Sequence, residues 1–138
     1  MIAFTAPNFL ELSAHQAIVK IPLAYRTKNH LGSMYFGALA VGADLVVGGL
    51  AWHLIQSSGQ LLDMIFKDFQ AEYLKRAEGD VIFVCEEGEA ISEMIADVVA
   101  AKERRNRSIS AYALVPERCG DEKVASFRLT LSLKLREC

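Results

Sequence analysis

One acidic residue, Asp44, lies in the middle of an apolar stretch, residues 34–55, that contains no other Asp, Glu, Lys or Arg. An unpaired carboxylate in apolar surroundings is energetically costly, and such groups mark functional sites more often than not. The chemistry open to Asp44 is that of a general base or a nucleophile. The structural alternative is that it only hydrogen-bonds a neighbouring loop.

The residues before this stretch predict the start of a helix. Asn29 belongs to a turn, and Ser33 is a suitable N-cap. We therefore expect a helix over residues 33–56 that is apolar on nearly every side and is buried for that reason.

The start of this helix offers a second chemical element. The first turn of a helix has unpaired N–H groups and a partial positive charge, so the N–H groups of Phe36 and Gly37 would form an oxyanion site for a polarised carbonyl. Asp44 lies about 10 Å further along the axis, seven residues beyond Gly37. One helix cannot bring both to the same carbonyl, but two helices packed antiparallel across a twofold axis can.

The length of the apolar stretch also raises the possibility of a membrane span, which needs about 20 residues. Three features argue against a span: the central Asp44, which costs roughly 2.5–3.5 kcal/mol at that depth, four glycines, and the lack of flanking basic clusters. We expect a core helix instead.

The rest of the chain alternates between the two secondary-structure periods. An alternation of two predicts strands, and a stripe at helical spacing predicts an amphipathic helix over residues 87–103. The expected strands are residues 17–25, 64–77, 81–85, 108–115 and 124–136. Residues 1–14 form a lead-in with a short helix near 7–13. The pattern predicts one α+β domain, residues 1–138, in which an antiparallel sheet wraps a long central helix.

The turn and the acid together resemble a known family. The motif is Asn29-x-x-Gly32-x-x-Tyr35-Phe36-Gly37 followed by Asp44. It resembles the hotdog-fold acyl-CoA thioesterases of the phenylacetate-pathway kind and the related DUF4442 group, whose signature is Asn-x-x-Gly-x-x-His-Gly-Gly with an acid nine residues after the histidine. Here Tyr35 replaces the histidine and Phe36 the first glycine.

The resemblance implies a hotdog fold and hydrolysis of an acyl-CoA or acyl-carrier thioester. It implies that Asp44 of one chain is the general base or nucleophile near the helix start of a second chain, with Asn29 orienting Asp44 or the water. Tyr35, Phe36 and Gly37 would contact the substrate. The chain is then a homodimer, and two dimers pairing further would give a tetramer.

A basic cluster near residue 105 is a further possible site. Lys102, Arg104, Arg105 and Arg107, offset by Glu103, give a net charge of +3 (four bases less one acid). Arg104, Arg105 and Arg107 are expected to bind the phosphates of coenzyme A, which belongs to the substrate; no other cofactor is expected. The alternative is a solvated helix end. The three histidines have no metal-ligand spacing, so no metal is expected.

Composition excludes some classes of function and leaves two alternatives open. A net charge of −2 and a pI near 5.9 argue against a nucleic-acid partner. Three cysteines without CxxC spacing favour reduced thiols and a cytoplasmic location. The alternatives to a thioesterase are a non-catalytic hotdog module that binds an acyl chain or acyl-CoA or only dimerises, and a related dehydratase, ranked last because it needs a histidine paired with an acid.

Overall fold

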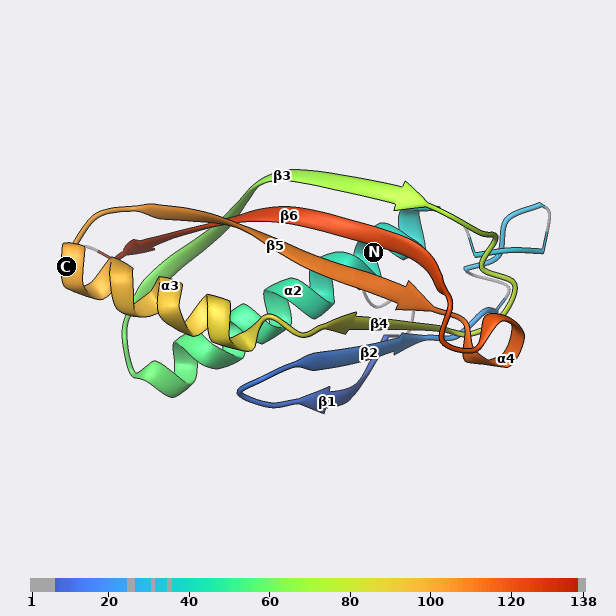
Figure 1. The fold of residues 1–138 in the computed structure, drawn as a ribbon, viewed down its shortest axis with the longest axis horizontal. Coiled ribbons are helices and arrows are strands. Elements are labelled where there is room, and N and C mark those ends of the chain that lie inside the picture. The colour runs from blue at the N-terminus through green and yellow to red at the C-terminus, as the bar shows by residue number, and fades with distance from the viewer. Residues whose placement is uncertain (1–6, 25–26, 31, 35, 137–138) are drawn as a thin grey trace.

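A six-stranded antiparallel sheet wraps around one long helix in the computed structural model, which describes residues 7–24, 27–30, 32–34 and 36–136 (Figure 1). In chain order the elements are β1 (Asn8–Leu12), β2 (Ala17–Ile21), α2 (Phe36–Ser58), β3 (Leu62–Tyr73), β4 (Val81–Cys85), α3 (Gly88–Ala101), β5 (Arg105–Leu114), α4 (Pro116–Cys119) and β6 (Lys123–Leu135). The strand order is β1-β2-β4-β5-β6-β3. The predicted α+β architecture is confirmed.

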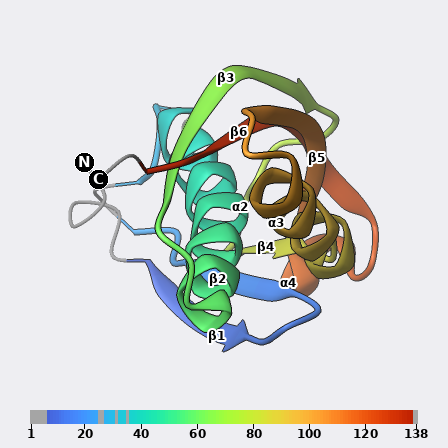
Figure 2. The same cartoon turned by 90° about the vertical axis from the view of Figure 1, so that its left-hand side faces the viewer.

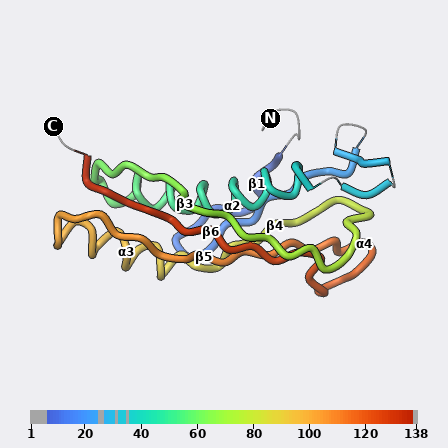
Figure 3. Tube along the Cα trace, turned by 90° about the horizontal axis from the view of Figure 1, so that it is seen from above, coloured from blue at the N-terminus to red at the C-terminus, as the bar shows by residue number. Residues whose placement is uncertain are grey.

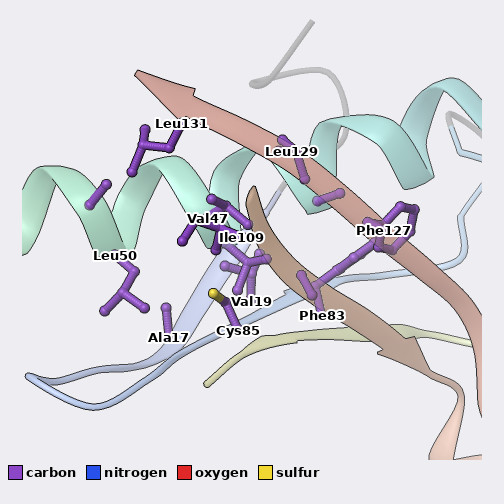
Figure 4. Close-up of a cluster of buried hydrophobic side chains, with 14 of the residues drawn as sticks. Ala17, Val19, Val47, Leu50, Phe83, Cys85, Ile109, Phe127, Leu129 and Leu131 are labelled. Atoms are coloured by element: carbon purple, nitrogen blue, oxygen red, sulfur yellow. The ribbon is translucent and has the colours of Figure 1, made fainter. Parts of the chain in front are cut away.

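Both long helices pack on the same face of the sheet. Figure 2 shows the sheet curving around α2, with α3 beside it, and α3 contacts α2, β5 and β6. The core lies between the helices and the inward side chains of the strands. In Figure 4, Val47 of α2 points toward Val19 and Ile109 of the sheet, and Leu50 lies beside Ala17. α2 is long and apolar enough to cross a membrane, but it is the core helix of this sheet.

The burial of α2 repeats every four residues. Pairs of buried residues alternate along the whole helix with pairs that are exposed or half-buried. The buried pairs are Ala38 and Leu39, Gly42 and Ala43, Val46 and Val47, Leu50 and Ala51, and Leu54 and Ile55. The other pairs leave a strip of the helix surface uncovered, and we call it the open strip. The predicted burial of α2 is therefore confirmed on the side that packs in the core, while the open strip stays uncovered within one chain.

The open strip combines large apolar, small and acidic side chains. Phe36 is 73% exposed and Trp52 is 58% exposed. Between them along the same row lie Ala40, Asp44 and Gly48, each four residues from the next. On the opposite side of the helix the packing is close, because a Cβ atom on Gly42 would lie 2.3 Å from the ring of Phe83.

β3 forms one edge of the sheet and exposes apolar side chains. It pairs with β6 and has a register shift between Phe66 and Asp68. Ile65, Phe69 and Tyr73 are 51%, 40% and 45% exposed. An edge strand of this length with apolar side chains is a ready template for pairing with another strand.

Several sequence predictions need correction. α2 begins at Phe36 and not at residue 33, so Ser33 is not its N-cap, and β5 begins at Arg105 and not at residue 108. The short helix expected at 7–13 is wrong, because Asn8–Leu12 is strand β1, which pairs with β2. The first predicted strand ends at Ile21 because Pro22 cannot donate an N–H to the sheet. The strand predicted over 64–77 covers Leu62–Tyr73, so residues 74–77 lie beyond it. Strand β4 has the predicted bounds.

Candidate functional site

Asp44 lies on the open strip of α2 and is exposed in the single chain. Among the described residues, none forms a hydrogen bond or ion pair with its carboxylate that would explain it structurally. Partial burial raises the pKa of Asp44 above its ordinary value of 3.8. Its neighbours on the strip are apolar or glycine, so a second apolar surface packed here would remove more water from this carboxylate.

The turn before α2 is held by the residue that the sequence motif singled out. The N–H of Asn29 donates to the Ser33 carbonyl at 2.6 Å, and the N–H of Ser33 donates to Oδ1 of Asn29 at 3.1 Å. Gly32 has a φ of 81° and donates to the Asn29 carbonyl at 3.1 Å. Met34 N–H donates to the Ala77 carbonyl at 2.8 Å, which fastens the turn to the chain after β3. Asn29 thus fixes where α2 starts.

A pocket of about 400 Å³ opens at the start of α2. We call it the helix-start pocket. Asn29, Ser33 and Phe36 line one side, and Leu74 and Arg76 are among the residues on the other. Ser33 is 3% exposed, and its Oγ has no hydrogen-bond partner among the described residues.

Asp44 is not among the residues that line the helix-start pocket. It lies about 12 Å along the axis from Phe36, the first residue of α2, at 1.5 Å per residue. One chain therefore brings Asn29 and Phe36 together but does not bring Asp44 to them. Gly37 is half-buried in the first turn, and Tyr35 is outside the described residues.

The predicted basic cluster is spread over separate contacts. α3 ends at Ala101 and β5 begins at Arg105, so Arg105 and Arg107 belong to a strand. Arg105 pairs with Glu103 at 3.0 Å, and Arg107 pairs with Glu93 at 3.3 Å. Arg104 instead donates to Oγ of Ser132 at 2.7 Å and lines a pocket at the other end of α2.

The thiol of Cys85, on β4, lies away from the open strip. Cys85 is fully buried, and burial raises the pKa of its thiol to about 11, so this thiol is expected to be unreactive. Within the described part of the chain, no group of three or more His, Cys, Asp or Glu side chains is placed to hold a metal ion.

Two features of the site were not predicted from the sequence: the open hydrogen-bonding capacity of Ser33 and the exposure of Trp52. The first depends on tertiary contacts and has no sequence signal. The exposure of Trp52 does have a sequence signal, because Phe36, Asp44 and Trp52 are spaced by eight residues and so share one row of α2.

Comparison with protein families and solved structures identifies the chain's relatives. The model of the domain of unknown function DUF4442 matches residues 3–125. The chain belongs to the DUF4442 family. A comparison of this DUF4442 chain with curated proteins found no significant match.

The solved structures that this DUF4442 chain resembles share its fold over nearly the whole length. A protein of unknown function from Pseudomonas aeruginosa, described as a probable thioesterase, has a TM-score of 0.79 and 21% identity over 96% of this chain and 85% of that one. A Chlorobaculum tepidum protein of unknown function has a TM-score of 0.83 and 13% identity over 97% and 85%. A thioesterase from Haemophilus influenzae has a TM-score of 0.72 and 11% identity over 97% and 82%. The fold is the hotdog fold, as predicted.

Proposed function

We propose that this protein is a thioesterase that hydrolyses acyl-CoA or acyl-carrier thioesters at two sites shared between two copies of the chain. The observation that carries the proposal is Asp44, the only acidic side chain of α2, on the open strip and without a structural partner among the described residues. The structural neighbours described as thioesterases support the reaction class. A panel of acyl-CoAs with a thiol reagent tests it.

The uncovered surfaces of the chain support a homodimer. The open strip of α2 and the apolar edge strand β3 would both be covered if a second copy extended the sheet through β3. A twofold axis makes such a contact self-complementary and places the two β3 strands, and the two α2 helices, antiparallel. A tetramer built from two such dimers stays part of the proposal.

The register of the two helices follows from the separation of Asp44 and Gly37. If the twofold axis passes close to Ala40 and Val41, Asp44 of one copy is level with Gly37 of the other. Ala40 and Val41 are half-buried members of the open strip. The small side chain of Ala40 allows two helix backbones to approach closely, and Val41 adds apolar surface to the contact. The second copy thus supplies the helix start that Asp44 does not reach in its own chain.

The chemistry then needs no group beyond these two. Water attacks the thioester carbonyl carbon while the Asp44 carboxylate takes its proton. The carbonyl electron pair moves to oxygen, where the N–H groups of Phe36 and Gly37 of the second copy stabilise the negative charge. When the intermediate collapses, the carbon–sulfur bond breaks and the leaving thiolate takes the proton from Asp44. The products are a carboxylic acid and a free thiol.

Asn29 and Ser33 complete the proposed site as positioning residues. Asn29 holds the turn from which α2 starts, and therefore holds the oxyanion site in place. Among the described residues Cys85 and Cys119 are free thiols, which supports the cytoplasmic location expected for an enzyme of this kind. Tight acyl-CoA binding without turnover would instead favour the non-catalytic module.

The proposed role of Asp44 predicts the acidic limb of the pH–rate profile. Only the ionised carboxylate accepts a proton, so activity is lost as pH falls through its pKa. Because partial burial raises the pKa of Asp44, the midpoint of this limb is expected above pH 3.8. Measurement of kcat/KM from acidic to neutral pH checks this. The limb should be absent from the residual activity of Asp44→Asn, and its persistence there would assign it to another group.

The proposed dimer predicts different effects of two matched substitutions. Ile65 on β3 and Leu10 on β1 are 51% and 53% exposed and lie on the two opposite edges of the sheet. Ile65→Asp places a charge at the proposed interface and is expected to raise the dimer dissociation constant about tenfold or more, whereas Leu10→Asp leaves it unchanged. Light scattering across a dilution series measures this. The reverse pattern would place the interface at β1.

A further inference from the structure

A second pocket, of about 590 Å³, lies at the C-terminal end of α2. We call it the helix-end pocket. Trp52 and Ile55 of α2, Ile65 of β3, and Arg104 are among its lining residues. In Figure 3 the start of β3 and the end of α3 lie at one end of the molecule, while α4 and the turn before α2 lie at the other. The helix-end and helix-start pockets of one chain are thus far apart.

Arg104 is the basic side chain of this pocket that no acid neutralises. It is held in place by Ser132, which is fully buried, through a hydrogen bond of 2.7 Å. Within the described residues Arg104 forms no ion pair. Arg136, the other arginine of the pocket, pairs with Asp63 at 2.9 Å. A guanidinium has five N–H donors, so Arg104 keeps most of them for a ligand.

The position of Trp52 relates this pocket to Asp44. Trp52 lies eight residues after Asp44 on the same row of α2, about 12 Å further along the axis. The arm of coenzyme A between its sulfur and its first phosphate spans on the order of 15 Å when extended. A thioester whose carbonyl lies beside Asp44 therefore reaches Arg104 with its phosphates if this arm follows Trp52.

We propose that the helix-end pocket binds the phosphate-bearing carrier arm of the substrate, with Arg104 as its phosphate ligand and Trp52 beside the arm. The proposal rests on the proposed function and deepens it, because it names the residues that bind the phosphate-bearing arm that coenzyme A and a phosphopantetheine carrier share. It also selects one arginine from the basic residues at 102–107. An arginine fork suits phosphate oxygens because it donates two parallel hydrogen bonds.

The twofold arrangement makes the same pocket part of a shared site. Antiparallel pairing of β3 with its copy places the start of β3, at the helix-end pocket, beside the end of the other β3. The helix-start pocket, lined by Tyr73 and Leu74, lies at that other end. The helix-end pocket of one copy then lies next to the helix-start pocket of the second copy, with Asp44 of the first copy close to both. Neither chain alone contains the whole site.

Binding of free coenzyme A to the intact dimer tests the proposal without any need for catalysis. Trp52 is the only tryptophan of the chain, so its fluorescence reports directly on the helix-end pocket. Coenzyme A is expected to change this fluorescence saturably, and Arg104→Ala is expected to weaken its binding about tenfold or more, as for loss of a charge-assisted hydrogen bond. Pantetheine, which has no phosphate, should bind equally to both proteins.

Arg107→Ala is the matched control, because Arg107 is similarly exposed but pairs with Glu93. It should leave the coenzyme A affinity within about twofold, well under the effect of a charge-assisted bond. The proposal is overturned if coenzyme A does not bind, if Arg104→Ala binds it as the wild type does, or if pantetheine binding falls as much. Coenzyme A binding that needs Arg104 without hydrolysis of any acyl-CoA would support this pocket and contradict the thioesterase. Hydrolysis with an unchanged KM in Arg104→Ala would support the thioesterase and contradict the role of this pocket.

Discussion

Asp44→Asn is expected to lower kcat about 10²–10⁴-fold, the usual contribution of a general base. The substitution keeps the size of the side chain, and Asp44 is exposed in the single chain, so folding should be unaffected. Gly37→Pro should have a comparable effect, about 10²–10³-fold, because it deletes one oxyanion N–H while proline is tolerated in the first turn of a helix. Gly37→Ala keeps the N–H group and is the control.

A mixture of these two variants decides whether the site is shared between copies. In a mixed dimer, one shared site carries both substitutions and the other carries neither. Random assortment makes half of the dimers mixed, so about a quarter of wild-type activity should return when the two inactive chains are refolded together. If Asp44 and the helix start of the same chain form the site, every site in the mixture carries a substitution and no activity returns.

The second prediction with a large effect is that Gly42→Ala destabilises the protein, although helix propensity alone would predict that it stabilises α2. Alanine is preferred to glycine within a helix by about 1 kcal/mol. A Cβ atom on Gly42 would, however, lie 2.3 Å from the ring of Phe83, which is fully buried and cannot move freely. Gly42→Ala is therefore expected to lower the free energy of unfolding by about 1–3 kcal/mol, the usual cost of overpacking a core. Urea denaturation at fixed protein concentration measures it.

Gly48→Ala is the control on the same helix. The nearest atom to a Cβ at Gly48 belongs to the ring of Phe66, at 3.5 Å, which is an ordinary contact. This variant should be no less stable than the wild type. Phe83→Leu in the Gly42→Ala background should recover part of the loss, because the two sites share one contact. A Gly42→Ala protein as stable as Gly48→Ala would show that the ring moves aside at little cost.

The sequence alone was sufficient for most of the fold. Strand β4 has the predicted bounds, and β6 is nearly as predicted, because their side chains follow regular patterns of burial. β1 was predicted as a short helix. All five of its residues are exposed in the structure, so no face of it needed to be apolar and no alternation marks it in the sequence. Its strand conformation depends on pairing with β2, which is a tertiary interaction.

The site was predictable only in its parts. The turn at Asn29, the helix start and Asp44 were each visible in the sequence, because turn chemistry and a lone acid are local signals. The contacts of the arginines could not be predicted from the sequence. Arg104, Arg105 and Arg107 are close in sequence, yet they bind Ser132, Glu103 and Glu93, respectively. Arg104 precedes β5 while Arg105 and Arg107 lie on it, and sequence spacing does not record which partner each side chain meets.

The four-residue repeat in the burial of α2 limits how two copies of this helix can meet. Four residues turn a helix by about 400°, so a row with this spacing drifts by about 40° at each step and winds around the rod. A second straight helix can stay in contact with such a row of side chains over only one or two turns. In the proposed dimer the two α2 helices are therefore expected to cross, at roughly −50° if rows of this kind interlock. The helices would then diverge on both sides of the crossing, and the wedge-shaped spaces between them would be accessible to a flexible acyl or carrier chain.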